Sequence, residues 1–237
     1  MTPDNLWPPV YTIKKHPRAK HVKLKASAQH GLELIVPPRF NLKHVPSILD
    51  ENKSWILKQL LKLQQTAAEP KTDNLPDKII LSALNQTWHI SYIASEVKLQ
   101  IITRPHQEIV LLGKIQNKLH CKKLLIAWIK QIAKTNLAIQ LKRLSEKINL
   151  PYSKLTIRDQ KTRWGSCTTK KSISLNYKLL FLPQPLAEHI LIHELCHTVQ
   201  LNHSEKFWRL VEKFDPDCEN NRRAVRKVDA FIPEWID

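Results

Sequence analysis

Glycine is scarce in this chain of 237 residues, which contains only Gly31, Gly113 and Gly165. Three isolated glycines cannot build a GxGxxG dinucleotide loop, a GxxxxGKS phosphate loop or a GxSxG nucleophile elbow. The sequence therefore excludes Rossmann enzymes, P-loop enzymes and the common serine hydrolases.

Paired cysteines and long apolar runs are also missing. The four cysteines are widely spaced and form no CxxC pair, which argues against a zinc ribbon and against a small disulfide scaffold. No stretch approaches the roughly eighteen consecutive apolar residues of a membrane span, and the start, MTPDNLWPPV, lacks a signal-peptide pattern. We expect reduced thiols, a cytoplasmic location and no membrane partner.

Acidic residues are outnumbered by basic ones, 21 against 38, which gives a net charge of +17 with neutral histidine. Such a charge favours anionic partners, such as nucleic acid, nucleotides or acidic protein. A well-solvated surface explains the same composition. Charge alone therefore leaves a nucleic-acid partner possible without requiring one.

The first part of the chain has the alternating pattern of strands. Residues 21–27 and 32–36 predict a hairpin with a turn at His30 and Gly31, and helical spacing of apolar residues predicts a helix over 46–66. Three further strand-like runs lie at 87–93, 97–103 and 108–112.

The segment 67–77 concentrates proline and polar residues and is predicted to be a linker or long surface loop. Together these patterns predict a β-rich region over 1–112 that contains one helix.

A long helix is predicted between Gly113 and Pro151, because this interval lacks glycine and proline and has apolar residues at helical spacing. Its other side is rich in lysine, which is typical of a solvated face and also of a surface that follows a phosphate backbone.

The remaining elements complete an α+β fold. Strands at 154–160 and 172–178 flank the shorter segment 162–167, which predicts a small antiparallel sheet. Helices are predicted over 186–199 and 204–214, with Ser204 placed to cap the second one.

The helix over 186–199 carries the motif HExxH, formed by His193, Glu194 and His197. Two histidines four residues apart project from one helix face and can bind one metal ion. Zinc prefers such nitrogen ligands, and it lowers the pKa of a water molecule from near 16 to roughly 7. Glu194 is then predicted to take the proton of that water as the general base.

A three-histidine zinc site needs one more ligand, and His203 is the candidate. An unbroken helix would point His203 away from the other two, so the helix must end first. Asn202 tolerates the left-handed conformation that ends helices, which would let the chain turn back. His189, one turn before His193, is either a competing ligand or a histidine that packs behind the ligands.

The spacing HExxHxxxxxH also occurs in metzincin proteases, where a glycine makes the turn and a methionine lies beneath the metal. Here Gln200 replaces the glycine, and Met1 is the only methionine. We therefore exclude this chain from the metzincins.

Four motifs together resemble the YgjP-like metallopeptidase domain, a bacterial family related to the SprT-like zincins. They are RWGSC at 163–167, LNYKL at 175–179, HELCH at 193–197 and NHSEKFW at 202–208. The resemblance is specific over 154–227 and weaker over the N-terminal strands and helix. It implies a zincin-like catalytic domain over 113–237, with zinc held by His193, His197 and His203 and with Glu194 catalytic.

The substrate is less defined than the metal site. The zincin relationship implies peptidase activity, whereas one member of the family is assigned nucleoside triphosphate pyrophosphatase activity, notably towards UTP. A third alternative is a structural zinc in a protein whose basic helix binds nucleic acid.

Substrate contacts are expected near RWGSC. Gly165 inside a strand indicates a bulge or a close backbone approach, and an edge strand here could pair with an extended peptide. Arg158 and Arg163 could instead bind phosphate, since a guanidinium offers a two-pronged match. An ion pair of Arg163 with a nearby carboxylate, with Trp164 in the core, is the structural alternative.

Overall fold

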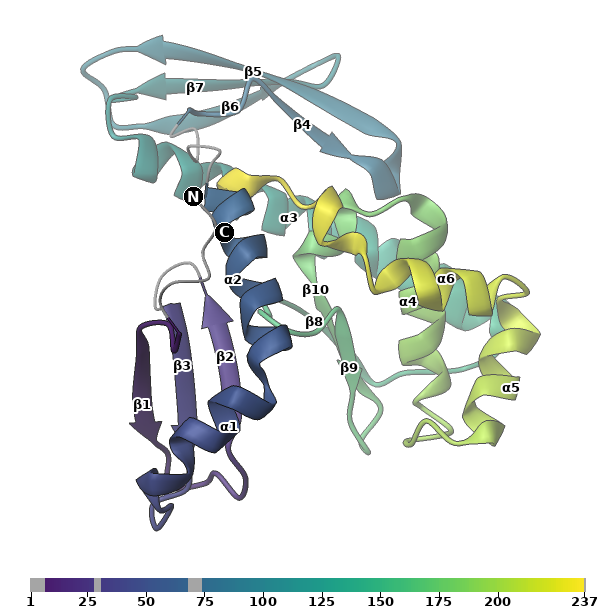
Figure 1. Cartoon of the computed structure of the whole chain (residues 1–237). Coiled ribbons are helices and arrows are strands. Elements are labelled where there is room, and N and C mark those ends of the chain that lie inside the picture. Colours follow the sequence, from purple (N-terminus) through teal and green to yellow (C-terminus); the bar gives the residue numbers. More distant parts are fainter. Residues whose placement is uncertain (1–6, 28–30, 68–73, 237) are drawn as a thin grey trace. The chain divides into compact units, whose positions relative to one another are not determined.

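The computed structural model describes residues 7–27, 31–67 and 74–236 (Figure 1). Two compact units divide the chain, Met1–Thr72 and Asp73–Asp237. The predicted turn residue His30 and residues 68–73 of the predicted linker lie outside the described residues.

The first unit contains a three-stranded sheet of β1 (Tyr11–Lys15), β2 (Lys23–Ser27) and β3 (Gly31–Val36) in the order β1-β3-β2. Strands β2 and β3 pair antiparallel, as the predicted hairpin requires, and β1, which the sequence pattern did not indicate, pairs parallel to β3. One face of the sheet shares a core with the helices that follow, formed by Leu32, Leu34, Val36, Val45, Leu49 and Ile56.

The helix predicted over 46–66 is divided into α1 (Val45–Glu51) and α2 (Lys53–Ala67) after a short 3-10 turn at Leu42–His44. The break lies at Asn52, whose backbone leaves the helical conformation at φ −104° and ψ 13°. Its side-chain amide donates to the carbonyl of Ile48 at 2.8 Å. Asparagine side chains compete in this way for the backbone groups of a helix. The spacing of apolar residues continues across Asn52, so it predicted one helix instead of two.

The second unit begins with a four-stranded sheet in the order β4-β5-β7-β6. The strands are β4 (Lys78–Leu81), β5 (Gln86–Ala94), β6 (Gln100–Arg104) and β7 (Glu108–Gly113). Strands β5 and β7 pair parallel, and the outer pairs are antiparallel.

Helix α3 (Lys118–Ile148) confirms the predicted long helix. Asn117 caps its start by accepting from the backbone N–H of His120 at 2.9 Å, and Asn149 ends it in the left-handed conformation at φ 55°. Its buried stripe lies in the same core as Ile79, Leu81, Ile109 and Leu111 of the sheet. The boundary between the two compact units therefore lies between residues 72 and 73 of the chain. The sequence pattern indicated a boundary after residue 112.

The second sheet of this unit consists of β8 (Lys154–Arg158), β9 (Gly165–Cys167) and β10 (Ser172–Asn176) in the order β8-β10-β9. It is mixed, not antiparallel as predicted, because β10 pairs parallel to β8 and antiparallel to β9. The chain reverses between β8 and β9 and again between β9 and β10, so that β8 and β10 run in the same direction. This order leaves β9 at an edge of the sheet.

Three helices complete the unit: α4 (Gln184–Cys196), α5 (Glu205–Phe214) and α6 (Cys218–Val225). The first two were predicted, with α4 ending earlier than expected, and α6 was not. Short 3-10 helices lie at Ser82–Leu84, Tyr177–Phe181, Val228–Phe231 and Glu234–Ile236. Within the described ranges, no helix is both long and apolar enough to cross a membrane. Strand β9 lies beside α4, and this contact forms the site described next (Figure 1).

Candidate metal centre

Three histidine rings converge where α4 ends. The Nε2 atom of His193 lies 3.1 Å from Nε2 of His197 and 3.1 Å from Nε2 of His203. Three ring nitrogens directed at one point make a set that could hold one metal ion.

The turn that brings His203 back differs from the expectation. Helix α4 ends at Cys196 and not at residue 199, and the N–H groups of Val199 and Gln200 both donate to the carbonyl of Cys196. Asn202 is not among the described residues with positive φ, so the left-handed conformation expected there does not occur. Ser204 occupies the position before α5, yet its side chain makes no capping hydrogen bond. The early end of α4 is what directs His203 towards the other two rings.

The ring of His197 is oriented with its Nε2 atom as the acceptor. Nδ1 of His197 donates to the carbonyl oxygen of Gln200 at 2.8 Å, which leaves its Nε2 lone pair directed at His193. Burial, together with the neighbouring His197 and His203, lowers the pKa of His193 to about 3, and burial also lowers the pKa of His197. Neutral imidazoles are the form that binds a metal.

The separations fit zinc. Two nitrogens bound tetrahedrally at roughly 2.05 Å would lie about 3.3 Å apart, close to the 3.1 Å found here. Aromatic residues of α5 hold the rings in place: Phe207 stacks on His197 at 4.4 Å between centroids, and Trp208 stacks on His203 at 5.7 Å. The residues present thus match a zinc site in atom type and spacing.

Glu194 lies directly against strand β9. A Cβ atom built on Gly165 would come within 2.6 Å of Cγ and of Oε1 of Glu194, so any larger residue at this position would displace the Glu194 side chain. Two reasons for a glycine were expected here, a bulge or a close backbone approach. The structure shows the close approach, between the backbone of β9 and the side chain of Glu194. The other oxygen, Oε2, is buried without a hydrogen-bond partner in the part of the chain that the structure describes. Burial raises the pKa of the Glu194 carboxyl to about 8, against the opposing effect of the Arg163 cation.

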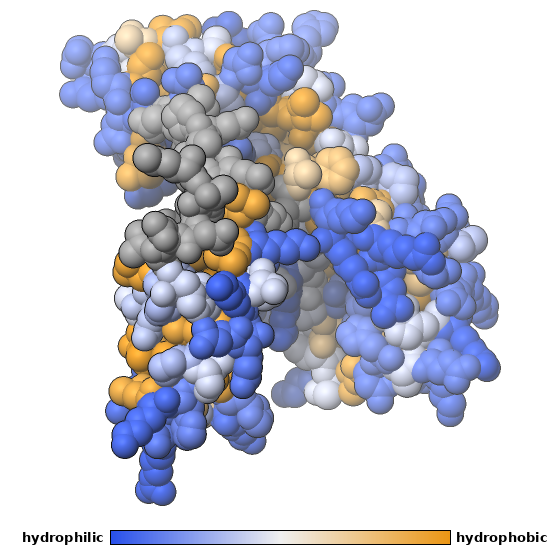
Figure 2. Space-filling view, in the orientation of Figure 1, coloured by the Kyte–Doolittle hydropathy of each residue, from blue (hydrophilic) through white to orange (hydrophobic). Residues whose placement is uncertain are grey.

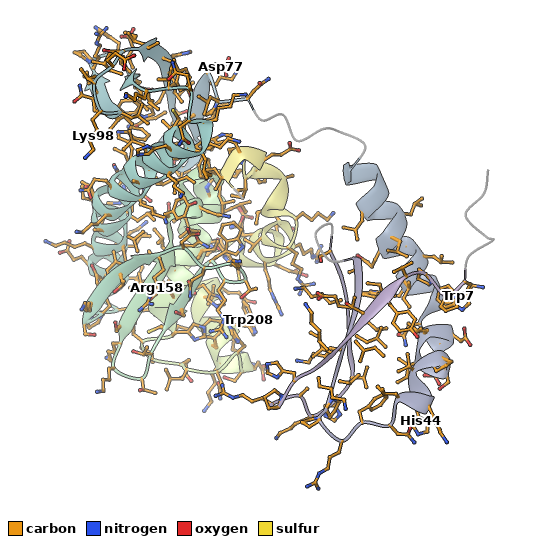
Figure 3. The ribbon with its side chains drawn as sticks, turned by 90° about the vertical axis from the view of Figure 1, so that its left-hand side faces the viewer. Trp7, His44, Asp77, Lys98, Arg158 and Trp208 are labelled. Atoms are coloured by element: carbon orange, nitrogen blue, oxygen red, sulfur yellow. The ribbon has the colours of Figure 1, made fainter. Side chains whose placement is uncertain are left out.

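A pocket of about 590 Å³ opens over these groups. Its lining includes the three histidines, Glu194, and the segment from Thr162 to Cys167, so Arg163 and Gly165 both contribute to it. Arg158 does not line the pocket: its Nε atom donates to Oγ of Ser174 across the sheet at 3.1 Å. Figure 3 labels Arg158 on β8 and Trp208 on α5.

His189 forms a second buried polar cluster behind the first. Its Nδ1 atom lies 2.5 Å from Oδ2 of Asp215, and the side-chain amide of Asn221 donates to both oxygens of that carboxylate at 3.1 Å. These atoms and Cys218 are close enough to hold a metal. However, two ligands of one zinc lie about 3.3 Å apart, farther than the 2.5 Å between His189 and Asp215. The Asp215 carboxylate also already accepts hydrogen bonds from Asn221. These contacts indicate a hydrogen-bonded network that ties α4 to α6.

Two residues of this region carry no sequence signal. Asp215 and Arg222 come from the end of α5 and from α6, and no spacing pattern links them to HExxH. Only their positions in the folded chain bring them to His189 and to the pocket.

A family model described as YgjP-like, metallopeptidase domain, matches residues 20–227. Among solved structures, the metallopeptidase zymogen abylysin of Pyrococcus abyssi is 27% identical, with 39% of this chain and 94% of that chain covered and a TM-score of 0.35. The zymogen jannalysin of Methanocaldococcus jannaschii is 20% identical, with coverages of 39% and 96% and the same TM-score of 0.35. No curated protein matches the chain.

Proposed function

The chain belongs to the family of YgjP-like metallopeptidase domains, and from this membership we propose that it is a zinc-dependent peptidase. His193, His197 and His203 are the proposed ligands. The observation that carries the proposal is the convergence of three Nε2 atoms at 3.1 Å beside a buried carboxylate in one pocket. A bound zinc ion would supply a Lewis acid that lowers the pKa of a water molecule to roughly 7.

Glu194 is the proposed general base. Its Oε2 atom is buried and makes no hydrogen bond within the described residues, so this oxygen is free to accept a proton from the attacking water. The same oxygen then returns the proton to the amine nitrogen that leaves when the peptide bond breaks. Gly165 holds this carboxylate in place, because the backbone of β9 packs against its side chain.

Strand β9 is the proposed platform for the peptide. One of its edges pairs with β10, and the other pairs with no strand in the described part of the chain. An extended peptide can add to such an edge through backbone hydrogen bonds. This arrangement would lay the peptide along Gly165–Cys167, beside Glu194.

Replacement of Glu194 by Gln tests the mechanism. We expect about one zinc per chain in both proteins and a loss of kcat by roughly a thousandfold in the variant, because the proton acceptor is removed while the ligands stay. Glu188→Gln is the matched control, since Glu188 lies on the same helix outside the pocket. Unchanged turnover in Glu194→Gln would refute the role of this residue.

A second candidate function, hydrolysis of a nucleoside triphosphate to a monophosphate and pyrophosphate, is favoured by the two arginines in the pocket lining. A parallel screen of peptides and UTP separates the two candidates. Release of UMP and pyrophosphate that is lost in Glu194→Gln, without peptide cleavage, would replace the peptidase proposal.

A further inference from the structure

Two arginines line the pocket that contains the three histidines. Arg163 precedes β9, and Arg222 comes from α6. Within the described ranges, no carboxylate lies within ion-pairing distance of either guanidinium, whereas Arg223, the neighbour of Arg222, pairs with Glu219. The ion pair considered for Arg163 is thus absent from this part of the structure, and both cations face a pocket instead.

The pocket has an excess of positive charge. Glu194 is the one acidic residue in its lining, and this side chain is buried with the residue only 5% exposed. Arginine stays protonated at all ordinary pH values. The lining therefore has two permanent cations against a single carboxylate, which is the proposed base, and a bound metal ion would add further positive charge. A concave site of this charge attracts anions.

Arg222 is held in position beside the candidate metal centre. Its guanidinium carbon lies 4.0 Å from the ring centroid of Trp208, and Trp208 in turn stacks on His203 at an interplanar angle of 24°. Stacking uses the face of the guanidinium and leaves its N–H edge available for hydrogen bonds. In the view of Figure 2, the surface over α5 and α6 is mostly hydrophilic.

Arg163 is positioned on the side of Glu194. Its backbone carbonyl accepts from the side-chain amide of Asn176 at 3.0 Å, and the same amide donates to the carbonyl of Gln160 at 2.8 Å. Asn176 is only 3% exposed, so this contact anchors the segment before β9. Arg163 also stands two residues before Gly165, whose backbone touches Glu194.

We propose that the pocket selects substrates with an anionic group, a carboxylate or a phosphate, next to the bond that is cut, and that Arg163 and Arg222 bind this group. The inference rests on the proposed function for the position of the cut bond. It revises the arginine pair suggested by the sequence, because Arg222 takes the place of Arg158. On the peptide side, it identifies the substrates as peptides with Asp, Glu or a terminal carboxylate beside the cleavage point.

Matched peptides test the selection. Each pair differs only by Asp against Asn, or Glu against Gln, at the residues on either side of the cut bond. We expect kcat/KM to be about tenfold higher for the acidic member, the ratio that corresponds to roughly 1.4 kcal/mol. Arg163→Gln and Arg222→Gln should each reduce this ratio towards one, and Arg223→Gln, on the same helix as Arg222 but outside the pocket lining, should not.

Binding measurements separate this inference from the proposed function. Zinc-loaded protein is titrated by calorimetry with N-acetylglutamate α-amide, its neutral counterpart N-acetylglutamine α-amide, and inorganic phosphate, which requires no turnover. Binding of the two anions that weakens by about tenfold in each pocket-arginine variant supports the inference, even if no peptide is cleaved. Phosphate bound in preference to the carboxylate would identify a phosphate-bearing substrate.

Two results would overturn the inference. One is equal binding or equal cleavage of the acidic and amide compounds by the wild-type protein, which leaves the peptidase proposal intact. The other is anion binding that is unchanged in both arginine variants, since the anion would then bind elsewhere. Thermal denaturation of each variant verifies that its fold is kept.

Discussion

A single methyl group added at Gly165 tests how the carboxylate of Glu194, the proposed general base, is positioned. The Cβ atom of alanine would lie 2.6 Å from Cγ and Oε1 of Glu194 and 2.7 Å from Cδ. Carbon atoms in ordinary contact lie about 3.5–4.0 Å apart, so the Glu194 side chain must move by roughly 1 Å. Gly165 does not adopt positive φ, so the backbone itself accepts alanine.

The expected effect falls on activity more than on stability. A displacement of roughly 1 Å at a catalytic group costs about a hundredfold in rate. The carboxyl group is the far end of a flexible side chain and can rotate away, so the free energy of unfolding should fall by only about 1 kcal/mol, the low end for overpacking. Gly165→Ala is therefore expected to fold, to bind zinc and to be nearly inactive.

The assay combines kcat/KM on a cleaved peptide, zinc content and the thermal midpoint. Ser172→Ala serves as the control, because Ser172 lies on the neighbouring strand β10 and not in the pocket lining. Wild-type activity in Gly165→Ala would refute the positioning argument. Loss of zinc together with activity would refute it as well, since the effect would then pass through the histidines.

Three further expectations follow from the same geometry. His203→Ala should weaken zinc binding by at least about a hundredfold in a chelator competition, since even contacts behind the ligands are worth 10–100-fold; unchanged affinity would exclude His203 as a ligand. Asp215→Ala should lower the free energy of unfolding by about 2 kcal/mol in urea, because it leaves the buried ring of His189 without its hydrogen-bond partner, whereas the exposed Asp217→Ala should change it little. Removal of zinc by a chelator should abolish turnover and lower the thermal midpoint, and added zinc should restore both. The stability lost is about 4 kcal/mol when free zinc was present at a thousand times its Kd. A thermal midpoint unaffected by the chelator would mean that no metal stabilises the fold.

The sequence by itself determined the local features of this protein. Positions 193 and 197 share a helix face because the helix repeats every 3.6 residues, so the pairing of these histidines follows from their spacing. The long uninterrupted interval before Pro151 became α3 for the same kind of reason, since apolar periodicity and the lack of glycine and proline act within a few turns of one helix. Gly165, a glycine within a predicted strand, indicated a bulge or a close approach of the backbone there.

The tertiary structure decided which residues meet. Glu194 is the partner of Gly165, Asp215 that of His189, and Trp208 holds Arg222 beside the pocket. The order of the strands, which puts β10 between β8 and β9 and leaves β9 exposed at an edge, is equally a property of the assembled sheet. Such contacts join residues far apart in the sequence and depend on the packing of whole elements, so no periodicity or spacing within one segment can reveal them. For this reason, the three histidines of the candidate metal site could be proposed from the sequence, while the arginine and tryptophan of α5 and α6 that border it became visible only in the fold.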